Sequence, residues 1–357
     1  MDWYVTEVID KAFDRTKKCL LEPFDFWKWA KLAILIMLIG GAGSGLNSSG
    51  NNYSASDSDV HKMTDVFDNE LWHISPPDLS SNMALIGAAI VLLILFILFF
   101  AYVSNVMEFV FVESLIKNDV RFWEYTRMFL GSGFYLFILR FIVTLIILIP
   151  IGIVSILGFV ALDTVSAASL IPLLLMFIPL ILVLAIIAGT VGSFINLAIP
   201  VSIYNEQSIF SAFGSVFRRF RMDWKQIVLY WIGRVVLFII VGIIEFIAAI
   251  IIILALGLIS LLIDGMLYLI LAAVGSGEMT LWIVLGPVIF IQILVLIALM
   301  LLLSVPGGVF IKYHMLSFLE KWYPEVDLPI FDARYDEENE SIVGNMDESA
   351  DEFVINE

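Results

Sequence analysis

The sequence predicts an all-α integral membrane protein with six transmembrane helices, and two observations support this fold class. The first is composition: hydrophobic residues make up 61% of the 357 residues, charged residues make up only 15%, and the mean hydropathy is +0.99. Soluble domains are about 45–50% apolar. A helix needs about 20 apolar residues to cross a hydrocarbon layer of about 30 Å, and several stretches of this chain are longer than that.

The second observation is the distribution of positive charge. Eighteen of the nineteen Lys and Arg residues fall into four segments at alternate ends of the long apolar stretches, and only Lys62 lies between these segments. Cationic residues are retained on the cytoplasmic side during insertion. We therefore expect a multi-pass protein of the cell membrane with both termini in the cytoplasm. No cleavable signal peptide is evident in the first 22 residues, so the first span is expected to direct insertion.

The expected elements follow from these stretches and from the segments between them. Residues 4–21 have the 3.6-residue periodicity of an amphipathic helix, and segments 108–133 and 202–225 combine cations with aromatic residues, as interfacial helices do. The six spans are expected at residues 29–45, 83–105, 134–161, 170–201, 227–263 and 281–305. A kink or break is expected near Pro150 and a break at 306–308. Residues 46–82 are expected to form the only long outer loop.

The fifth span leaves two interpretations open. Its apolar run, from residue 227 to residue 263, is too long for one upright helix at about 1.5 Å per residue. Either the helix is strongly tilted, or Gly257 divides it from an outer piece at residues 264–274 that is re-entrant or a separate helix.

Matching spacings favour an internal repeat. Arg127 and Arg140 are thirteen positions apart, and so are Arg221 and Arg234. The pattern predicts three parallel units around an axis near the membrane normal. Each unit is a short interfacial elbow helix followed by a transmembrane hairpin, and the units are expected at residues 4–105, 108–201 and 202–311. The alternative is that positively charged inner loops resemble one another in composition alone.

The opening of the chain resembles a known group. Residues 20–29 read Leu-Leu-Glu-Pro-Phe-Asp-Phe-Trp-Lys-Trp and are followed by a glycine cluster at 40–45. This pattern resembles an uncharacterised family of archaeal polytopic membrane proteins, which implies no known activity. The elbow-and-hairpin layout over residues 1–330 is similar to the membrane domain of some bacterial glycerophosphodiester phosphodiesterases. Their catalytic barrel is absent from this sequence, so the similarity implies only a membrane region.

Polar residues at membrane depth form the first candidate site, because each must be paired or must face water. Counting along span five from Arg234 places Glu245 near the middle of the bilayer, and Gln292 on span six reaches a similar depth. We expect a hydrogen bond between Glu245 and Gln292. Two interpretations remain open: a proton-coupling or cation site at Glu245, or a structural contact worth only about 0.6–2 kcal/mol.

A second candidate site is a set of cations at the inner surface of the membrane, and it comprises Arg127, Arg140, Arg218, Arg219, Arg221 and Arg234. Arg140 and Arg234 lie about two turns inside their spans, level with Glu108, Glu113 and Asn196. We expect a ring of polar contacts there, which either gates a pathway or fixes the depth of the helices. Near the surface, the arginines at 218–221 are expected to attract anionic lipid with about 1 kcal/mol each, although the topology rule alone also places them there.

Signatures of enzymes and cofactors are missing from the sequence. His61, His73 and His314 are expected on different sides of the membrane, so they cannot form one metal site. The glycines at 40–45 follow a transmembrane helix and precede no Walker lysine. Cys19 is the only cysteine, so it cannot form a disulfide within the chain. We therefore expect no enzyme activity, catalytic residue, metal, cofactor or nucleic-acid partner.

The acidic tail at residues 322–357 is expected to be a disordered cytoplasmic extension of one transmembrane domain at 1–321. Its end, residues 351–357, is a candidate docking segment for a cytoplasmic protein. The leading hypothesis is a non-enzymatic protein that organises the membrane or is a subunit of a membrane complex. The alternative is a small transporter or channel for a proton-coupled or lipid-like substrate that uses Glu245 and Gln292. A third class, lipid handling, predicts a lateral opening between hairpins beside residues 218–221.

Overall fold

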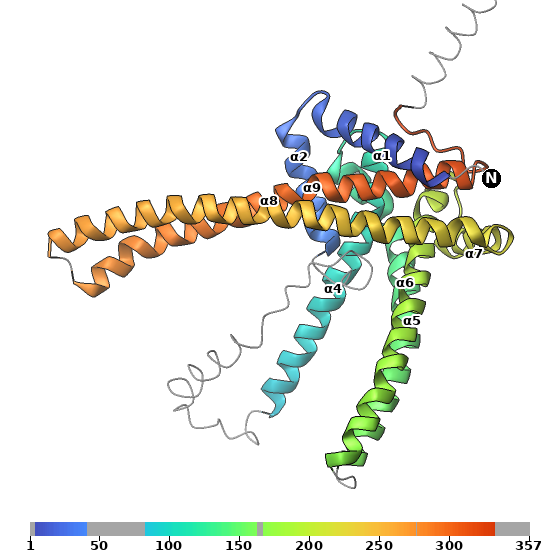
Figure 1. The fold of residues 1–357 in the computed structure, drawn as a ribbon, viewed down its shortest axis with the longest axis horizontal. Coiled ribbons are helices and arrows are strands. Elements are labelled where there is room, and N and C mark those ends of the chain that lie inside the picture. The colour runs from blue at the N-terminus through green and yellow to red at the C-terminus, as the bar shows by residue number, and fades with distance from the viewer. Residues whose placement is uncertain (1–3, 41–82, 163–166, 276, 333–357) are drawn as a thin grey trace, which may run out of the picture.

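The computed structural model describes residues 4–40, 83–162, 167–275 and 277–332, which form eight helices and no strand. The chain forms a hub from which long helical arms extend in different directions (Figure 1). The short helices lie in the hub, and they are α1 (Tyr4–Leu21), α2 (Phe26–Gly40) and α7 (Ile209–Met222). The long helices run from the hub into the arms, and they are α4 (Met83–Ile116), α5 (Phe122–Leu162), α6 (Ala167–Tyr204), α8 (Trp224–Ala273) and α9 (Glu278–Trp322).

The hub forms where the apolar faces of helices meet. Helix α1 buries one face, which comprises Val8, Ala12, Cys19 and Leu20. Helix α7 buries Ile209, Ala212 and Val216 in the same way. It begins after Ser208, whose Oγ accepts a hydrogen bond from the N–H of Ser211 and caps the first turn. The amphipathic helices expected at residues 4–21 and within 202–225 are therefore present.

Long helices change from exposed to buried where they enter the hub. Burial begins at Ser104 in α4, at Gly192 in α6 and at Val305 in α9. The arms are the parts of the long helices beyond the hub, where apolar side chains face outward. In α4 every residue from Ile86 to Ile97 is exposed, and Leu92 is 71% exposed. A helix that is apolar on all faces and has no protein around it is typical of a segment solvated by lipid.

Among the residues that the structure describes, five helices are long and apolar enough to cross a membrane, and they are α4, α5, α6, α8 and α9. The first expected span, residues 29–45, is described only as far as Gly40. Its described part lies in the hub, where Leu32 and Leu35 are buried and Ser104 donates a hydrogen bond to the Ile39 carbonyl at 2.8 Å. Helix α2 therefore runs beside the buried half of α4, and its described part does not extend into an arm.

The longest helices are less interrupted than expected. Helix α8 runs unbroken through Gly257, so strong tilt is the remaining interpretation of its length. Its 50 residues reach about 75 Å at about 1.5 Å per residue, more than twice the thickness of the hydrocarbon layer. Figure 1 shows the α8–α9 hairpin pointing in a different direction from the α5–α6 hairpin.

The break expected at residues 306–308 is wrong, because α9 continues through Pro306. Gly307 packs closely against α8, and Gly308 packs against Ile36 of α2, so neighbouring helices support this part of α9. Helix α5 likewise continues through Pro150.

The interfacial helix expected within residues 108–133 is not formed. Helix α4 continues to Ile116, and α5 begins at Phe122 and leads directly into its arm. The turn between them contains Asn118 with φ of 55°, a left-handed conformation that asparagine tolerates. Val112 and Leu115 lie in the segment expected to be interfacial, but both are buried in the hub. Continuation of α4 through this segment therefore buries its apolar side chains within the protein.

The packed part of the chain extends past the expected boundary at residue 321. Val326, Leu328 and Ile330 are buried against the hub, and the N–H of Phe331 donates to the carbonyl of Ile116 at 3.0 Å. The acidic composition predicts disorder from residue 322, but composition does not reveal that these three apolar side chains have a surface to pack against. The expected outer loop at 46–82 and the candidate docking segment at 351–357 lie outside the described residues.

Candidate functional site

A buried ion cluster lies where α4, α5 and α9 meet in the hub. Glu108 of α4 places Oε2 at 2.5 Å from Nη2 of Arg140 on α5, and its Oε1 accepts a hydrogen bond of 3.1 Å from Nζ of Lys312 on α9. The exposed fraction of the side chain is 6% for Glu108, 18% for Arg140 and 12% for Lys312. A buried carboxylate of this kind requires cations and hydrogen-bond donors around it. The cluster therefore fixes the relative positions of three helices.

Two asparagines extend the ion cluster. Arg140 donates from Nη1 to Oδ1 of Asn105 on α4 at 2.9 Å, and from Nη2 to Oδ1 of Asn196 on α6 at 3.1 Å. The planar guanidinium has five N–H donors in a fixed fork, so one side chain can bond several helices at once. Its Nε is buried and finds no hydrogen-bond partner within the described part of the chain.

The depth of the cluster follows from the helices that carry it. Glu108 lies four positions after burial begins at Ser104 in α4, and Asn196 lies four positions after burial begins at Gly192 in α6. Lys312 lies within the buried part of α9, after Val305. The cluster is therefore at the base of the arms, just inside the hub.

Arg234 of α8 lies at a cavity between α6 and α8. The cavity has a volume of about 370 Å³, and its lining residues are Ile186, Gly189, Thr190, Ser193, Asn196, Trp231, Arg234, Val235 and Phe238. Asn196 also accepts the hydrogen bond from Arg140, so the cavity and the ion cluster share a wall. Arg234 donates from Nη1 to the hydroxyl oxygen of Tyr230 at 2.7 Å and lies over the ring of Phe238 at 5.3 Å.

Aromatic rings hold α8 in place beside this cavity. Phe194 of α6 lies 5.7 Å from the ring of Trp231, whose Nε1 donates to Oγ of Ser193 at 2.9 Å. On another side of α8, the ring of Tyr230 stacks on Phe318 of α9 at 4.1 Å. Aromatic pairs contribute about 0.5–1.5 kcal/mol each beyond the area that they bury. They position α8 and, with it, Arg234.

The ion cluster and Arg234 together carry an excess of positive charge. Arg140, Lys312 and Arg234 are three cations, and Glu108 is the acid that pairs with two of them. Within the described ranges, no carboxylate lies within 4.0 Å of the Arg234 guanidinium. A cation beside an apolar layer is costly unless it meets an anion or water. The arrangement is therefore suited to bind an anionic group.

A second ion network attaches α1 to the end of the packed chain. Arg15 is fully buried and donates to Asp332 at 2.7 Å, to Glu320 at 2.9 Å and to Ser317 at 2.9 Å. Burial alone would lower the pKa of Arg15, but its hydrogen bonds to Asp332 and Glu320 outweigh burial and raise that pKa. Both ends of the described chain therefore lie together in the hub.

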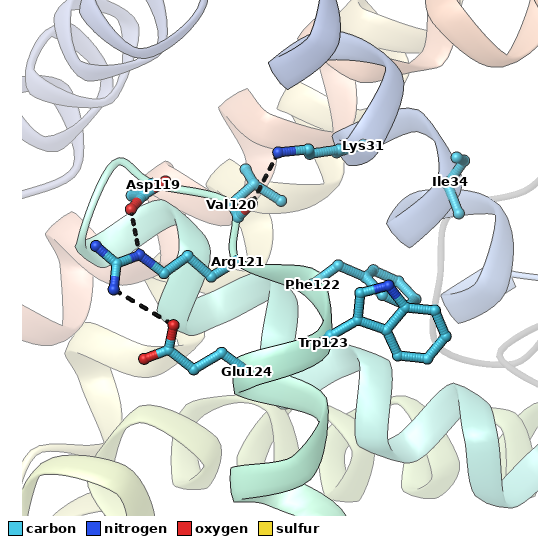
Figure 2. Close-up of a pocket in the computed structure, with 8 residues that line it drawn as sticks. All are labelled: Lys31, Ile34, Asp119, Val120, Arg121, Phe122, Trp123 and Glu124. Atoms are coloured by element: carbon cyan, nitrogen blue, oxygen red, sulfur yellow. Dashed lines mark hydrogen bonds and ion pairs between the residues drawn. The ribbon is translucent and has the colours of Figure 1, made fainter.

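A second cavity, of about 620 Å³, lies between α2 and the turn that joins α4 to α5 (Figure 2). Lys31 donates to the carbonyl of Val120 at 3.3 Å. Arg121 pairs with Asp119 at 2.8 Å and with Glu124 at 3.3 Å, and these carboxylates raise the pKa of Arg121, with Asp119 contributing most. The two acids balance the two cations here, unlike the charges around the cavity between α6 and α8.

The first expected site is not assembled, because Glu245 and Gln292 do not meet. Gln292 instead donates from Nε2 to Oδ1 of Asp264 at 3.0 Å, and Glu245 lies against Gly307. The expected hydrogen bond is therefore wrong. The reason is register: α8 and α9 are antiparallel, and the turn after Ala273 decides which of their residues face each other. Depth counted separately along each helix does not contain that information.

The six arginines expected at the inner surface divide into two groups. Arg140 and Arg234 belong to the site described above, and the other four lie on the surface of the hub. Arg219 pairs with Glu325 at 3.4 Å, and Arg221 lies 5.6 Å from the centre of the Phe217 ring. The remaining two are exposed, and they are Arg127 and Arg218.

Lys312 and Asn105 belong to the cluster although the sequence pattern did not indicate them. Glu108 offered a usable signal, because an acid within an apolar helix needs cations nearby. Spacing does not identify the partner, since Lys312 lies 204 positions away on another helix. Glu113, which was expected in the same ring, pairs with Lys117 at 2.6 Å outside the cluster.

Together these features define a class of protein, an all-α protein whose described part has five apolar helices long enough to cross a membrane and one hub that joins them. The chain belongs to the Family of unknown function (DUF7544), whose model matches residues 3–329. This membership fits the resemblance to an uncharacterised family. No curated protein and no solved structure is significantly similar to the chain. In the described ranges, no three His, Cys, Asp or Glu side chains are grouped to hold a metal ion.

Proposed function

We propose that this protein is a non-enzymatic multi-pass protein of the cell membrane, with its hub on the cytoplasmic side. Arm length supports the placement in a membrane. The arm of α4 covers residues 83–103 and the arm of α6 covers residues 167–191, which correspond to about 31 Å and about 37 Å at about 1.5 Å per residue. A hydrocarbon layer of about 30 Å fits this length and ends at the base of the arms.

Charge supports the orientation. Of the nineteen Lys and Arg residues, Lys62 and Arg334 lie outside the described ranges, and the other seventeen all lie in the hub. Because cations stay on the cytoplasmic side, the hub and both ends of the described chain are cytoplasmic in this proposal. The proposed six spans are the five described helices and the first expected span at residues 29–45, which the structure describes only as far as Gly40.

Internal repeats also remain part of the proposal, and matching positions in α4 and α6 support them. Ser104 and Gly192, where burial begins, are 88 positions apart. The same interval separates Asn118 from Glu206, which have φ of 55° and 50° in the turns that follow α4 and α6. Helices α1 and α7 are the elbows of the first and third units. The middle hairpin, α5 and α6, lacks an elbow.

The proposed role is to organise the surrounding membrane or to serve as a subunit of a membrane complex. The observation that carries this proposal is the separation of the arms (Figure 1). The arm of α4 is exposed on every face from Ile86 to Ile97, so it does not close around a passage with the other described arms. Apolar surface of this extent must be covered by lipid or by helices of another protein. The protein therefore acts on its neighbours in the membrane.

Topology is tested by labelling single cysteines in the full-length protein. Arg127→Cys and Arg218→Cys, each in a Cys19→Ser background, should react with a membrane-impermeant maleimide from the cytoplasmic side only. Labelling of the two positions from opposite sides would contradict the proposed orientation.

The role is tested in vesicles of phosphatidylglycerol and phosphatidylcholine that contain the full-length protein. Diphenylhexatriene anisotropy, which reports lipid order, should rise with protein content, because lipid fills the spaces between separated arms. A pH-sensitive dye inside the vesicles should show no proton flux. Flux without a change in lipid order would contradict a role in membrane organisation.

Proton-coupled transport is a second candidate function, and one observation favours it. Glu245 is a half-buried carboxyl in the long apolar helix α8, and it forms no hydrogen bond with another described residue. It lies at the part of α9 where Pro306 lacks a backbone N–H, which leaves the Leu302 carbonyl without its helical partner. If the vesicles show proton flux, Glu245→Gln should abolish it. Flux that persists in this variant would exclude Glu245 as the coupling group.

A further inference from the structure

We infer that the cavity between α6 and α8 binds the headgroup of one anionic phospholipid, with Arg234 contacting its phosphate. The inference rests on the membrane placement proposed above, because it requires the base of the arms to lie at the level of the lipid headgroups. Arg234 is the last cation of α8 before its apolar arm begins. It therefore lies where a headgroup from the cytoplasmic leaflet would reach the protein.

The cavity has a polar wall suited to a phosphate group. Thr190, Ser193 and Asn196 recur every third residue of α6 and line the cavity together, opposite Arg234 of α8. A guanidinium has five N–H donors, and the described hydrogen bond to Tyr230 uses one of them. Arginine binds phosphate through two parallel N–H donors, which makes such contacts strong and directional.

Charge selects an anionic headgroup over a zwitterionic one. Asn196 connects the cavity to Arg140, and the local cations Arg140, Lys312 and Arg234 exceed the one acid, Glu108. An anionic headgroup adds the missing negative charge. A phosphatidylcholine headgroup brings its own cation into a region that already has too many, so it compensates less of the excess.

The apolar side of the cavity selects a lipid over a free anion. Ile186, Val235 and Phe238 line this side. Ile186 is 61% exposed and Val235 is 57% exposed, and both continue into the outward faces of the arms. The arms of α6 and α8 diverge from the hub in Figure 1. Acyl chains attached to the bound headgroup can lie along these faces, whereas free phosphate gains nothing from them.

Native mass spectrometry of the full-length protein tests the inference. The protein is released from vesicles with equal amounts of dioleoylphosphatidylglycerol and dioleoylphosphatidylcholine. The wild type should retain one phosphatidylglycerol molecule in preference to phosphatidylcholine. Arg234→Gln should reduce this retention about tenfold, the effect of losing one charge-assisted contact. Arg127→Gln removes an exposed cation of α5 and should leave retention unchanged.

A second variant tests the cavity without removing a charge. A Cβ added at Gly189 would meet no atom within 4 Å, so Gly189→Leu can project a larger side chain into the cavity without disturbing the backbone. This variant should also lose the lipid. Gly152→Leu in the arm of α5 is the matched control, because its added Cβ likewise meets nothing within 4 Å, and it should keep the lipid.

Three outcomes would overturn the inference. They are equal retention of both lipids by the wild type, unchanged retention in Arg234→Gln and Gly189→Leu, and displacement of the lipid by millimolar inorganic phosphate. The last of these would show a site for free anions. Cysteine labelling tests the proposed membrane placement independently of the lipid site. Lost lipid preference with the expected labelling overturns the lipid site alone, whereas labelling from opposite sides overturns the membrane placement as well.

Discussion

Glu108 of α4 and Lys312 of α9 lie 204 positions apart in the chain and are joined by a hydrogen bond of 3.1 Å. The second oxygen of the same carboxylate pairs with Arg140 of α5. The helices involved belong to three different groups of arms: α4, the α5–α6 hairpin and the α8–α9 hairpin. One carboxylate therefore holds together parts of the protein whose arms diverge, and it does so at the point where they enter the hub.

Replacing Glu108 by glutamine should destabilise the protein strongly. Glu108→Gln keeps the shape of the side chain but leaves Arg140 and Lys312 buried without their counter-charge. Removing one partner of a buried ion pair costs about 3–5 kcal/mol. We expect a clearly lower midpoint of thermal unfolding in detergent micelles, followed by tryptophan fluorescence.

Glu124→Gln is the matched control for this experiment, because Glu124 pairs with Arg121 on the surface at 3.3 Å. Exposed pairs contribute about 0–1 kcal/mol. Adding Lys312→Met to Glu108→Gln removes one of the two stranded cations and should recover part of the lost stability. Equal midpoints for Glu108→Gln and Glu124→Gln would show that the ion cluster does not hold the hub together.

Gly133 marks a close approach of α5 to α4. A Cβ at Gly133 would lie 2.8 Å from the Cα of Val106, a backbone atom that cannot move independently of its helix. Gly133→Ala must therefore push the two helices apart, and overpacking of this kind costs about 1–3 kcal/mol. Gly131→Ala, whose Cβ would meet nothing within 4 Å, should instead stabilise α5 by about 0.5–1 kcal/mol. Thermal unfolding of both variants checks this, and equal midpoints would contradict the close packing.

Much of the ion cluster was predictable from the sequence because cations are costly in apolar surroundings. Arg140 lies two turns inside an expected span, so it needs polar partners at the same depth. The sequence indicated Glu108 and Asn196 at that depth, and the structure brings Arg140 into contact with both. The all-α class and the long apolar helices followed from composition in the same way.

Register between helices was not predictable, because it depends on where each helix ends. The partner of Gln292 is Asp264 rather than Glu245, since α8 continues unbroken through Gly257 to its turn after Ala273. An error of a few residues in that turn moves every facing pair by several Å at about 1.5 Å per residue. Tertiary contacts also determine the structure of residues 323–332. The segment is acidic in composition, but three of its apolar side chains, Val326, Leu328 and Ile330, are buried against the hub.

Loss of the Asp332 charge should loosen α1 from the hub. Asp332→Asn weakens a hydrogen bond of 2.7 Å to Arg15 and leaves this buried guanidinium with Glu320 as its remaining described carboxylate. Hydrogen bonds to charged groups contribute about 1.5–3 kcal/mol. We expect faster tryptic cleavage in α1, measured by limited proteolysis. Glu22→Gln is the control, because its exposed pair with Lys17 contributes little. Equal cleavage rates in both variants would mean that Arg15 does not anchor α1.

Gly307 of α9 and Glu245 of α8 should be energetically coupled, because the carboxyl occupies the space that a side chain at position 307 would need. A Cβ there would overlap Oε1 of Glu245 and lie 2.7 Å from Cγ1 of Val241. Gly307→Ala should therefore displace Glu245 and separate α8 from α9, at a cost of about 1–3 kcal/mol. Gly257→Ala is the control, because nothing lies within 4 Å of its added Cβ.

Glu245→Ala removes the obstructing carboxyl, so the double variant should be more stable than the sum of the two single effects predicts. Residues in contact show coupling of about 0.5–3 kcal/mol in such double-mutant cycles. Unfolding midpoints of the wild type, Gly307→Ala, Glu245→Ala and the double variant measure the coupling. Additive effects would show that Glu245 faces lipid rather than α9. That result would also weaken the transport alternative, because carboxyls that carry protons across a membrane face the protein interior or water rather than lipid.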